Sequence, residues 1–179
     1  TIHETLHFIP DIVPVHDSVT AHEGALLGKA GTIVISGTGS IALTRAATGQ
    51  SATAGGWGPL MGDEGSGYWI GLQALSLATR AADGRGADTQ LVTGIPQALG
   101  VTDLQAVHRL LYSAENPRPM IASLTRAVSA SASAGDEAAI TLLETAGRHL
   151  GDAAVAAHRS VPNGPELFSY TGGVFRSGK

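Results

Sequence analysis

Residues 31–71 read GTIVISGTGSIALTRAATGQSATAGGWGPLMGDEGSGYWIG. The apolar, β-branched run at 32–35 is long enough for one buried strand, and a second strand-like run follows at 41–44. Only the short segment SGTGS, with its two glycines, separates the two runs. This order of strand, tight turn and strand predicts a β-hairpin.

The turn made by Gly37, Thr38, Gly39 and Ser40 has the composition of an anion-binding loop. Glycine reaches backbone conformations with φ > 0 and lets a ligand approach closely, because it has no Cβ. Free backbone N–H groups, together with threonine and serine hydroxyls, form a nest that suits phosphate oxygens. Short glycine motifs also occur by chance, so for this motif alone a plain hairpin turn is an equal alternative.

Two further glycine-rich turns follow in the same stretch, GGWG at 55–58 and GDEGSG at 62–67. The second turn directly precedes a helical pattern at 68–82. So many glycines cost conformational entropy that a purely structural segment rarely accepts. A tryptophan between glycines is more often a packing residue than a ligand platform. Beside paired carboxylates and a phosphate-type loop, a ligand-binding role for Trp57 becomes competitive.

Taken together, GTGS and GGWGPLMGDEGSGYWIG resemble the sugar kinases of the N-acetylglucosamine and glucosamine kinase type. These kinases belong to the BadF/BadG/BcrA/BcrD group of actin-like ATPases. The match is long and nearly gapless over 31–71, and it extends more loosely to Asp17 upstream and to 170–177 downstream. The resemblance implies an α/β fold of the ribonuclease-H-like (actin-like ATPase) kind, with a mixed sheet flanked by helices. It also implies ATP-dependent phosphorylation of an amino sugar hydroxyl, with ATP and Mg²⁺ as cofactors.

The resemblance also assigns roles to individual residues. The implied general base is Asp17, the ATP-binding residues are Gly37, Thr38, Gly39, Ser40, Gly172 and Gly173, and the sugar-binding residues are Gly56, Trp57, Gly58 and Asp63. Mg²⁺ would bridge the ATP phosphates, so no side chain is predicted as a metal ligand. Glu64 either shares the role of Asp63 or orders the loop. Ile41 follows GTGS where N-acetylglucosamine kinases of animals carry a polar residue, which slightly favours glucosamine as the sugar.

The role of Asp17 has a structural alternative. We expect a short strand at 12–15 and a helix at 21–29, so Asp17 would lie between the end of a strand and the start of a helix. Open α/β sheets place ligand-binding residues at the carboxyl ends of their strands. A carboxylate at a helix start can also be a plain N-cap. The resemblance favours the general base, which accepts the proton of the sugar hydroxyl.

The remaining pattern predicts mostly helices. We expect a polar connection at 45–54, helices at 68–82, 89–98, 103–112, 119–133 and 136–160, a strand at 166–170, and a new helix after Gly172-Gly173. This order fits the second half of a two-domain actin-like sugar kinase. Residues 1–30 then end the N-terminal domain, and 31–179 form a C-terminal domain that is incomplete at its own C-terminus. We therefore expect a piece of a longer protein that is inactive alone.

The composition excludes several classes of protein. The chain has 179 residues, of which 43% are hydrophobic and 15% charged, with a net charge of −4 and no cysteine. Without a basic stripe, nucleic acid is not an expected partner. No apolar run approaches the length of a membrane span, so we expect a cytoplasmic protein whose partner is a small amino sugar. A homodimer stays open as its assembly.

The alternative function for the same fold is that of a non-catalytic ATP-binding regulator or activator. The dehydratase-activator branch of the family holds an iron–sulfur cluster through cysteines, and this chain has none. An intact Asp17 argues against a kinase-like protein that has lost its activity. The kinase is therefore the preferred interpretation.

Overall fold

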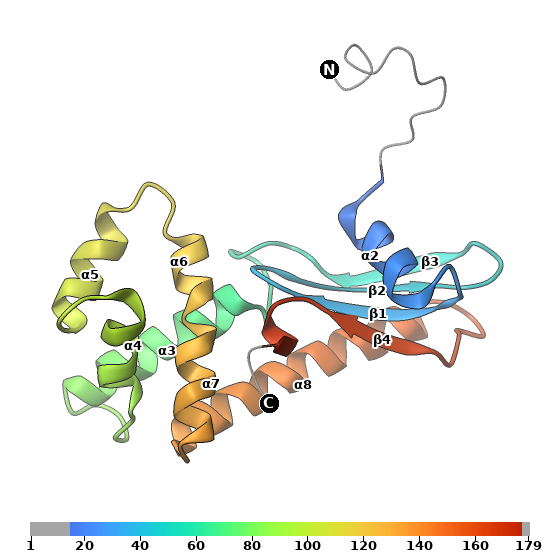
Figure 1. Cartoon of the computed structure of the whole chain (residues 1–179). Helices are drawn as coiled ribbons and strands as arrows, with labels where there is room; N and C mark the ends of the chain where they lie inside the picture. Colours follow the sequence, from blue (N-terminus) through green and yellow to red (C-terminus); the bar gives the residue numbers. More distant parts are fainter. Residues whose placement is uncertain (1–14, 177–179) are drawn as a thin grey trace, which may run out of the picture.

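A mixed four-stranded sheet forms one part of the molecule (Figure 1). The computed structural model describes residues 15–176. The strands are β1 (Gly31–Ser36), β2 (Ser40–Arg45), β3 (Ser51–Gly55) and β4 (Phe168–Thr171), in the order β3-β2-β1-β4. β1, β2 and β3 form an antiparallel meander, and β4 pairs in parallel with β1. The parallel pairing brings a segment from late in the chain beside the first hairpin.

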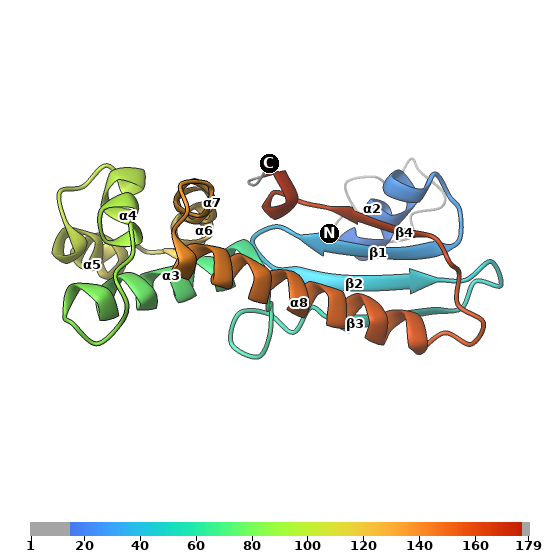
Figure 2. The same cartoon turned by 90° about the horizontal axis from the view of Figure 1, so that it is seen from below.

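Helices cover both faces of this sheet and extend beyond it (Figures 1 and 2). α8 (Glu137–Arg159) packs along one face, and the shorter α2 (Asp17–Leu26) packs on the other. The helical part beside the sheet contains α3 (Gly67–Ala82), α4 (Leu91–Leu99), α5 (Leu104–Ser113), α6 (Arg118–Ser123) and α7 (Thr125–Ser133). A single 3₁₀ turn, η1 (Val174–Arg176), follows β4.

One continuous helix, α8, contributes to both hydrophobic cores. Leu142 and Ala146, from its first half, pack with buried residues of α3, α4 and α7. Leu150, Ala154 and Ala157, from its second half, pack under the sheet. Because a single rigid helix is buried in both cores, the sheet and the helical part are fixed relative to each other. The junction between them therefore has a defined geometry.

The predicted fold class is confirmed, since the sheet is mixed and flanked by helices. The strands predicted at 32–35, 41–44 and 166–170 correspond to β1, β2 and β4. The polar connection predicted at 45–54 is wrong, because Ser51–Gly55 forms the strand β3. Its alanines and glycine have weak β-propensity, so the local sequence does not mark a strand. The strand exists because each of its five residues pairs with β2.

Two helix predictions also need correction. The first helix begins at Asp17 rather than at residue 21, and the strand expected before it lies outside the described residues except for Val15. The helix expected at 119–133 is divided into α6 and α7, which follow one another (Figure 1) and are separated at Leu124, the C-cap of α6 and the N-cap of α7. Leu124 is completely buried in the helical core, and Thr125 directly after it reaches Gly67. The new helix expected after the double glycine is only the short η1.

Asp136 links the start of α8 to the start of α4. Its Oδ1 accepts hydrogen bonds from the N–H groups of Ala138 (3.0 Å) and Ala139 (3.2 Å). Its Oδ2 accepts from Thr89 Oγ1 and from Gln90 N, both at 2.6 Å. Burial alone would raise the pKa of Asp136, but these four hydrogen bonds favour the ionised form more strongly. The net pKa is therefore lower than that of an ordinary aspartate.

Asp136→Ala should lower the free energy of unfolding by about 1–3 kcal/mol at neutral pH, because it removes a cap and two interhelical hydrogen bonds. The folded pKa is depressed, so this stabilisation is complete above the unfolded pKa of about 3.9 and is lost as pH falls through the folded pKa. Urea unfolding at neutral and acidic pH measures the effect. Asp103→Ala is the control, since the exposed Asp103 caps α5 through Ala106 N but binds no second helix. A difference from wild type that does not shrink in acid would contradict this account.

Candidate functional site

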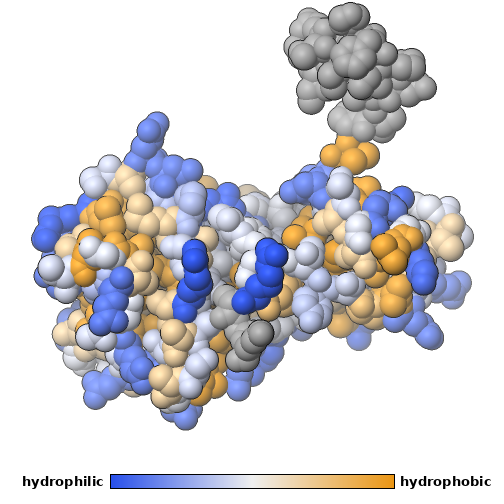
Figure 3. Space-filling model, viewed as in Figure 1, coloured by the Kyte–Doolittle hydropathy of each residue, from blue (hydrophilic) through white to orange (hydrophobic). Residues whose placement is uncertain are grey.

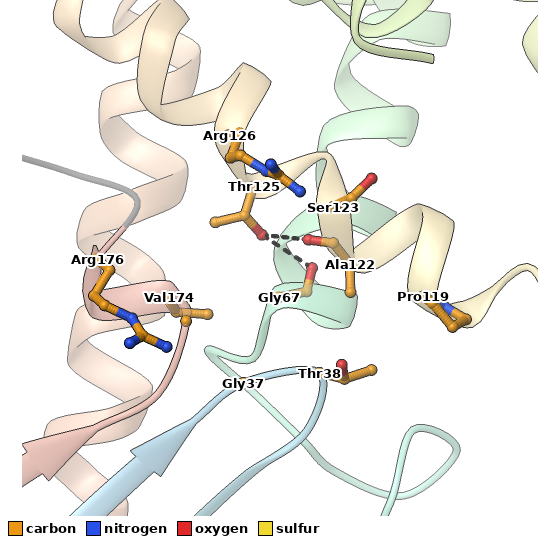
Figure 4. A pocket seen from close by; sticks show the side chains of 11 residues that line it. Gly37, Thr38, Gly67, Pro119, Ala122, Ser123, Thr125, Arg126, Val174 and Arg176 are labelled. Carbon is orange, nitrogen blue, oxygen red and sulfur yellow. Dashed lines mark hydrogen bonds between the residues drawn. The ribbon is translucent and has the colours of Figure 1, made fainter.

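A cavity of about 770 Å³ lies where the sheet meets the helices (Figure 4). Four segments that are far apart in the sequence form its walls: the β1–β2 turn, the start of α3, the α6–α7 junction and η1. Figure 3 shows strongly hydrophilic side chains on either side of this junction. The residues that line the cavity include Gly37, Thr38, Gly67, Arg126, Gly173 and Arg176.

The predicted phosphate turn is tight and is held from inside the protein. Gly37 N donates to Gly39 O (2.9 Å), and Ser40 Oγ donates to Glu64 O (2.8 Å). A Cβ at Gly37 would meet no atom within 4 Å, so protein packing does not require glycine there. Thr38 lines the cavity, and its hydroxyl has no hydrogen-bond partner among residues 15–176. The turn is thus rigid, but its cavity side has room and a free hydroxyl.

At Gly67 three walls of the cavity meet. Its N–H donates to Gly37 O (2.8 Å), and its carbonyl accepts from Thr125 Oγ1 (3.3 Å; Figure 4). A Cβ on Gly67 would lie 3.0 Å from Gly37 O and 3.2 Å from Ala122 O. Any larger residue would therefore push the turn away from the α6–α7 junction. Glycine here lets one backbone position hold both.

The predicted adenosine turn reaches the same cavity. β4 is parallel to β1, so the two strands end side by side. Gly172 has φ +120°, and a Cβ there would lie 2.1 Å from Ser36 O, so only glycine fits. Gly173 lines the cavity, and a Cβ there would meet nothing within 4 Å. The fold thus brings together the two turns that the sequence analysis assigned to ATP.

The predicted sugar loop lies outside this cavity. Gly56 and Gly58 both have positive φ, and a Cβ on Gly56 would lie 2.8 Å from Ile41 Cδ1. Trp57 between them is 71% exposed. It lines a smaller hollow of about 330 Å³, together with Glu64 and residues of α8. Gly56 therefore lets the loop pack closely over Ile41, while the indole of Trp57 remains exposed to solvent.

Asp63 lies under the phosphate turn, in the left-handed backbone region at φ +59°. Its side chain is only 5% exposed. Oδ1 accepts a hydrogen bond from Ser40 N (3.3 Å), and Oδ2 accepts one from Arg118 Nη2 (2.8 Å). A carboxylate has about four acceptor positions, so two such bonds leave capacity for a ligand hydroxyl. Sugar binding by Asp63 stays a prediction.

Asp17 is not among the residues that line the cavity. It is the first residue of α2, its side chain is 93% exposed, and its carboxylate lies 2.8 Å from His16 Nδ1. The alternative role as the N-cap is wrong, because His16 is the cap and its Nδ1 accepts from Ser18 N (3.2 Å). A carboxylate that does not cap the helix is free for other chemistry. Its role as a base stays a prediction.

Sequence reasoning missed three arginines near the cavity. Arg126 on α7 and Arg176 in η1 border the opening from two sides (Figure 4), and neither guanidinium group has a hydrogen-bond or ion-pair partner within the described part of the chain. Arg118, at the start of α6, contacts Asp63. A signal existed for Arg118, because the stiff segment NPRP at 116–119 holds it in place. No pattern marks the other two, which depend on tertiary contacts.

Neither a membrane-spanning helix nor a metal-binding group of side chains occurs in residues 15–176. No described helix has both the length and the apolar character needed to cross a membrane. The same residues contain no group of three or more His, Cys, Asp or Glu side chains that could hold a metal ion.

The sequence is similar to a known protein family and to individual proteins. The profile of the BadF/BadG/BcrA/BcrD ATPase family matches residues 5–179. An N-acetylmuramic acid/N-acetylglucosamine kinase of Clostridium acetobutylicum is 36% identical over 175 residues, which is 97% of this chain and 57% of that protein. An N-acetyl-D-glucosamine kinase of Dictyostelium discoideum is 40% identical over 88 residues, or 49% of this chain and 28% of that protein.

Two solved structures are also similar to this chain. A candidate N-acetylglucosamine kinase from Chromobacterium violaceum superposes with a TM-score of 0.75 at 34% identity, covering 91% of this chain and 55% of that one. A second candidate kinase, from Porphyromonas gingivalis, has a TM-score of 0.67 at 19% identity and covers 88% of this chain and 52% of that one. The second likeness concerns the fold alone. The chain spans just over half the length of the Clostridium relative and of both solved structures.

The packing of α3 against α6, beside the cavity, can be tested by substitution. A Cβ on Gly71 in α3 would lie 2.0 Å from Ile121 O in α6, so Gly71→Ala should displace α6 and destabilise the protein by about 1–3 kcal/mol. Gly147→Ala, in α8, is the matched control, because nothing lies within 4 Å of its Cβ. It should stabilise the helix by up to about 1 kcal/mol. Urea unfolding measures both. Equal effects of the two substitutions would refute the close approach of α3 and α6.

Proposed function

Because this chain belongs to the BadF/BadG/BcrA/BcrD ATPase family, we propose that it forms the nucleotide-binding part of an ATP-dependent sugar kinase. The observation that carries the proposal is a single cavity lined by both glycine turns, with Gly37 and Thr38 from one and Gly173 from the other. The reaction moves the γ-phosphoryl group of ATP to a hydroxyl of an amino sugar. Such a transfer depends on positioning and charge neutralisation more than on covalent chemistry.

ATP suits the cavity in size and in the chemistry of its walls. Its volume of about 770 Å³ is within the range of roughly 300–1,000 Å³ that ligand pockets occupy. Neither packing nor a positive φ requires glycine at 37 or 173, so the open space beside them is better explained by a ligand. Phosphate oxygens would bind the turn of Gly37, Thr38, Gly39 and Ser40 through the donors left on Thr38 and Gly39, because Gly37 N, Ser40 N and Ser40 Oγ donate within the protein. The adenosine would lie on Gly172 and Gly173.

Charge supports the same assignment. Arg126 and Arg176 border the cavity and offer guanidinium groups without acidic partners in the described chain. An ATP anion would be attracted from both sides. Mg²⁺, when bound with ATP, would neutralise further phosphate charge. The residues present therefore fit a magnesium nucleotide, with the protein holding the nucleotide and the nucleotide holding the metal.

For the sugar, we propose an amino sugar, with N-acetylglucosamine as the first candidate and glucosamine as the second. The names of both curated relatives include N-acetylglucosamine. Ile41, whose apolar side chain favoured glucosamine, packs under Gly56, so its type is explained by the loop itself. Gly56, Trp57, Gly58 and Asp63 would contact the sugar. The exposed indole of Trp57 offers a flat apolar surface for a sugar ring.

Asp17 would act as the general base. Its carboxylate would take the proton of the attacking sugar hydroxyl, and the resulting oxygen would attack the γ-phosphorus in line with the leaving ADP. The side chain has no role in capping α2, and its nearest partner is the imidazole of His16. A solvated, ionised aspartate can accept a proton once the substrate excludes water around it.

The full-length protein tests the proposal in a coupled ADP-release assay with N-acetylglucosamine and glucosamine. ATP-dependent turnover of either sugar is expected. ATP binding without turnover of any amino sugar would instead support the alternative, a non-catalytic ATP-binding regulator or activator of the same fold.

Thr38→Val removes one hydroxyl donor at almost constant volume. We expect kcat/KM for ATP to fall roughly 10- to 100-fold in the full-length protein, because a hydrogen bond to a charged group contributes about 1.5–3 kcal/mol. The melting temperature should change little. Thr53→Val, on the exposed side of β3, is the control and should leave ATP kinetics unchanged. Wild-type kinetics for Thr38→Val would mean that GTGS is only a hairpin turn.

Asp17→Asn keeps the shape of the side chain but cannot take up the proton. We expect the full-length variant to retain ATP and sugar binding while kcat falls by about 10²–10⁴-fold. Glu137→Gln is the matched control, since Glu137 is the other acidic residue in the first turn of a described helix. Both variants should lose only the modest interaction of a carboxylate with a helix N-terminus, so their melts should be similar. Wild-type turnover by Asp17→Asn would remove it from the mechanism.

A further inference from the structure

A partly buried ion pair, whose carboxylate is nearly buried, lies directly beneath the phosphate turn. Arg118 Nη2 donates to Asp63 Oδ2 at 2.8 Å, and the two side chains are 39% and 5% exposed. The pair joins segments that are distant in sequence, the loop before α3 and the start of α6. It differs from the exposed pair of Arg85 and Asp83, which lie two residues apart.

The carboxylate of this pair is in contact with the phosphate turn itself. Asp63 Oδ1 accepts from Ser40 N at 3.3 Å. A Cβ on Gly39 would lie only 2.9 Å from Asp63 Oδ2, so Gly39 is needed to admit the carboxylate. The turn and Asp63 therefore fit each other as one unit, and a displaced Asp63 would release the backbone at Ser40.

The guanidinium of Arg118 is held in one place. Its central carbon lies 5.7 Å from the centre of the Tyr68 ring, and Tyr68 N donates to Thr38 O in the turn. Its Nε is buried and has no hydrogen-bond partner within residues 15–176. A buried donor without a partner is unfavourable, so this position is not the one that stability alone would select. The contact with Asp63 is its one ion pair among the described residues.

We infer that Arg118 is a positioning residue of the nucleotide site. It holds the Asp63 carboxylate under the phosphate turn and neutralises its charge beside the ATP phosphates. The inference rests on the proposed function, since it assigns phosphate to this turn. Without Arg118, an uncompensated carboxylate would repel the phosphate groups and would no longer be fixed for Ser40 N or for a sugar hydroxyl.

A plain structural ion pair would behave differently. If Arg118 only stabilised the fold, its removal would lower the melting temperature and leave ATP affinity of the folded protein unchanged. If it acts through Asp63, its removal should weaken ATP binding only while Asp63 is charged. This dependence distinguishes the two roles.

The experiment is a double-mutant cycle in the full-length protein, with Arg118→Met, Asp63→Asn and the double variant. Calorimetry with magnesium ATP gives Kd for each, and thermal melts report folding. Arg118→Met should raise Kd roughly 10- to 100-fold, the range expected when a charged hydrogen-bonded group loses its partner. In the Asp63→Asn background the same substitution should change Kd by less than about threefold. Arg118→Lys keeps the charge and should recover part of the affinity, and Arg85→Met is the control that should leave Kd unchanged.

Equal effects of Arg118→Met in both backgrounds, or an unchanged Kd, would overturn the inference. If Arg118→Met does not fold, Arg118→Lys in the two Asp63 backgrounds decides in the same way, with a smaller change expected. Failure of the proposed function looks different. A wild-type protein that binds ATP but phosphorylates no amino sugar would refute the kinase, while the cycle on Kd would still test Arg118. A wild-type protein that binds no ATP would refute both.

Discussion

Backbone contact at Gly67 is the constraint on which the cavity depends. Its N–H binds Gly37 O, and its carbonyl accepts from Thr125 Oγ1, so the turn and the α6–α7 junction are both tied to the first residue of α3. The contact of Gly67 N with Gly37 O joins two peptide groups, so it does not change with side-chain rotamers. The phosphate turn is therefore preformed, and a ligand would not have to order it on binding.

Two other glycines also allow close contact between backbone segments. Gly172 brings the end of β4 against Ser36 of β1, and Gly71 brings α3 against Ile121 of α6. These glycines serve packing, because a Cβ would meet backbone atoms. Gly37 and Gly173 are different, since a Cβ on either would meet open space. The glycine-rich stretch thus serves two purposes, and the surroundings of each glycine show which one applies.

Sequence reasoning gave the fold class and the positions of strongly patterned elements. Apolar β-branched runs predicted β1 and β2, and long apolar stripes predicted α3 and α8. It failed where tertiary contacts decide. β3 is a strand only because β2 pairs with it, and the break between α6 and α7 occurs at a leucine, which carries no local signal for a break. For the site, the two turns were found from their motifs, whereas the stiff segment around Arg118 did not indicate its partner, Asp63, which is 55 residues away in sequence.

The two aspartates considered for catalysis occupy opposite environments. Asp63 is nearly buried, and its charge is balanced by Arg118 beside the turn assigned to phosphates. Asp17 is 93% exposed, and among residues 15–176 the ion-pair partner of its carboxylate is the imidazole of His16. A carboxylate close to a phosphate chain must be neutralised, because like charges repel. One that accepts a proton must keep a free lone pair and no strong cation, since a tightly paired carboxylate is a poor base. The environments of Asp63 and Asp17 therefore agree with the separate roles proposed for them, positioning for Asp63 and proton transfer for Asp17.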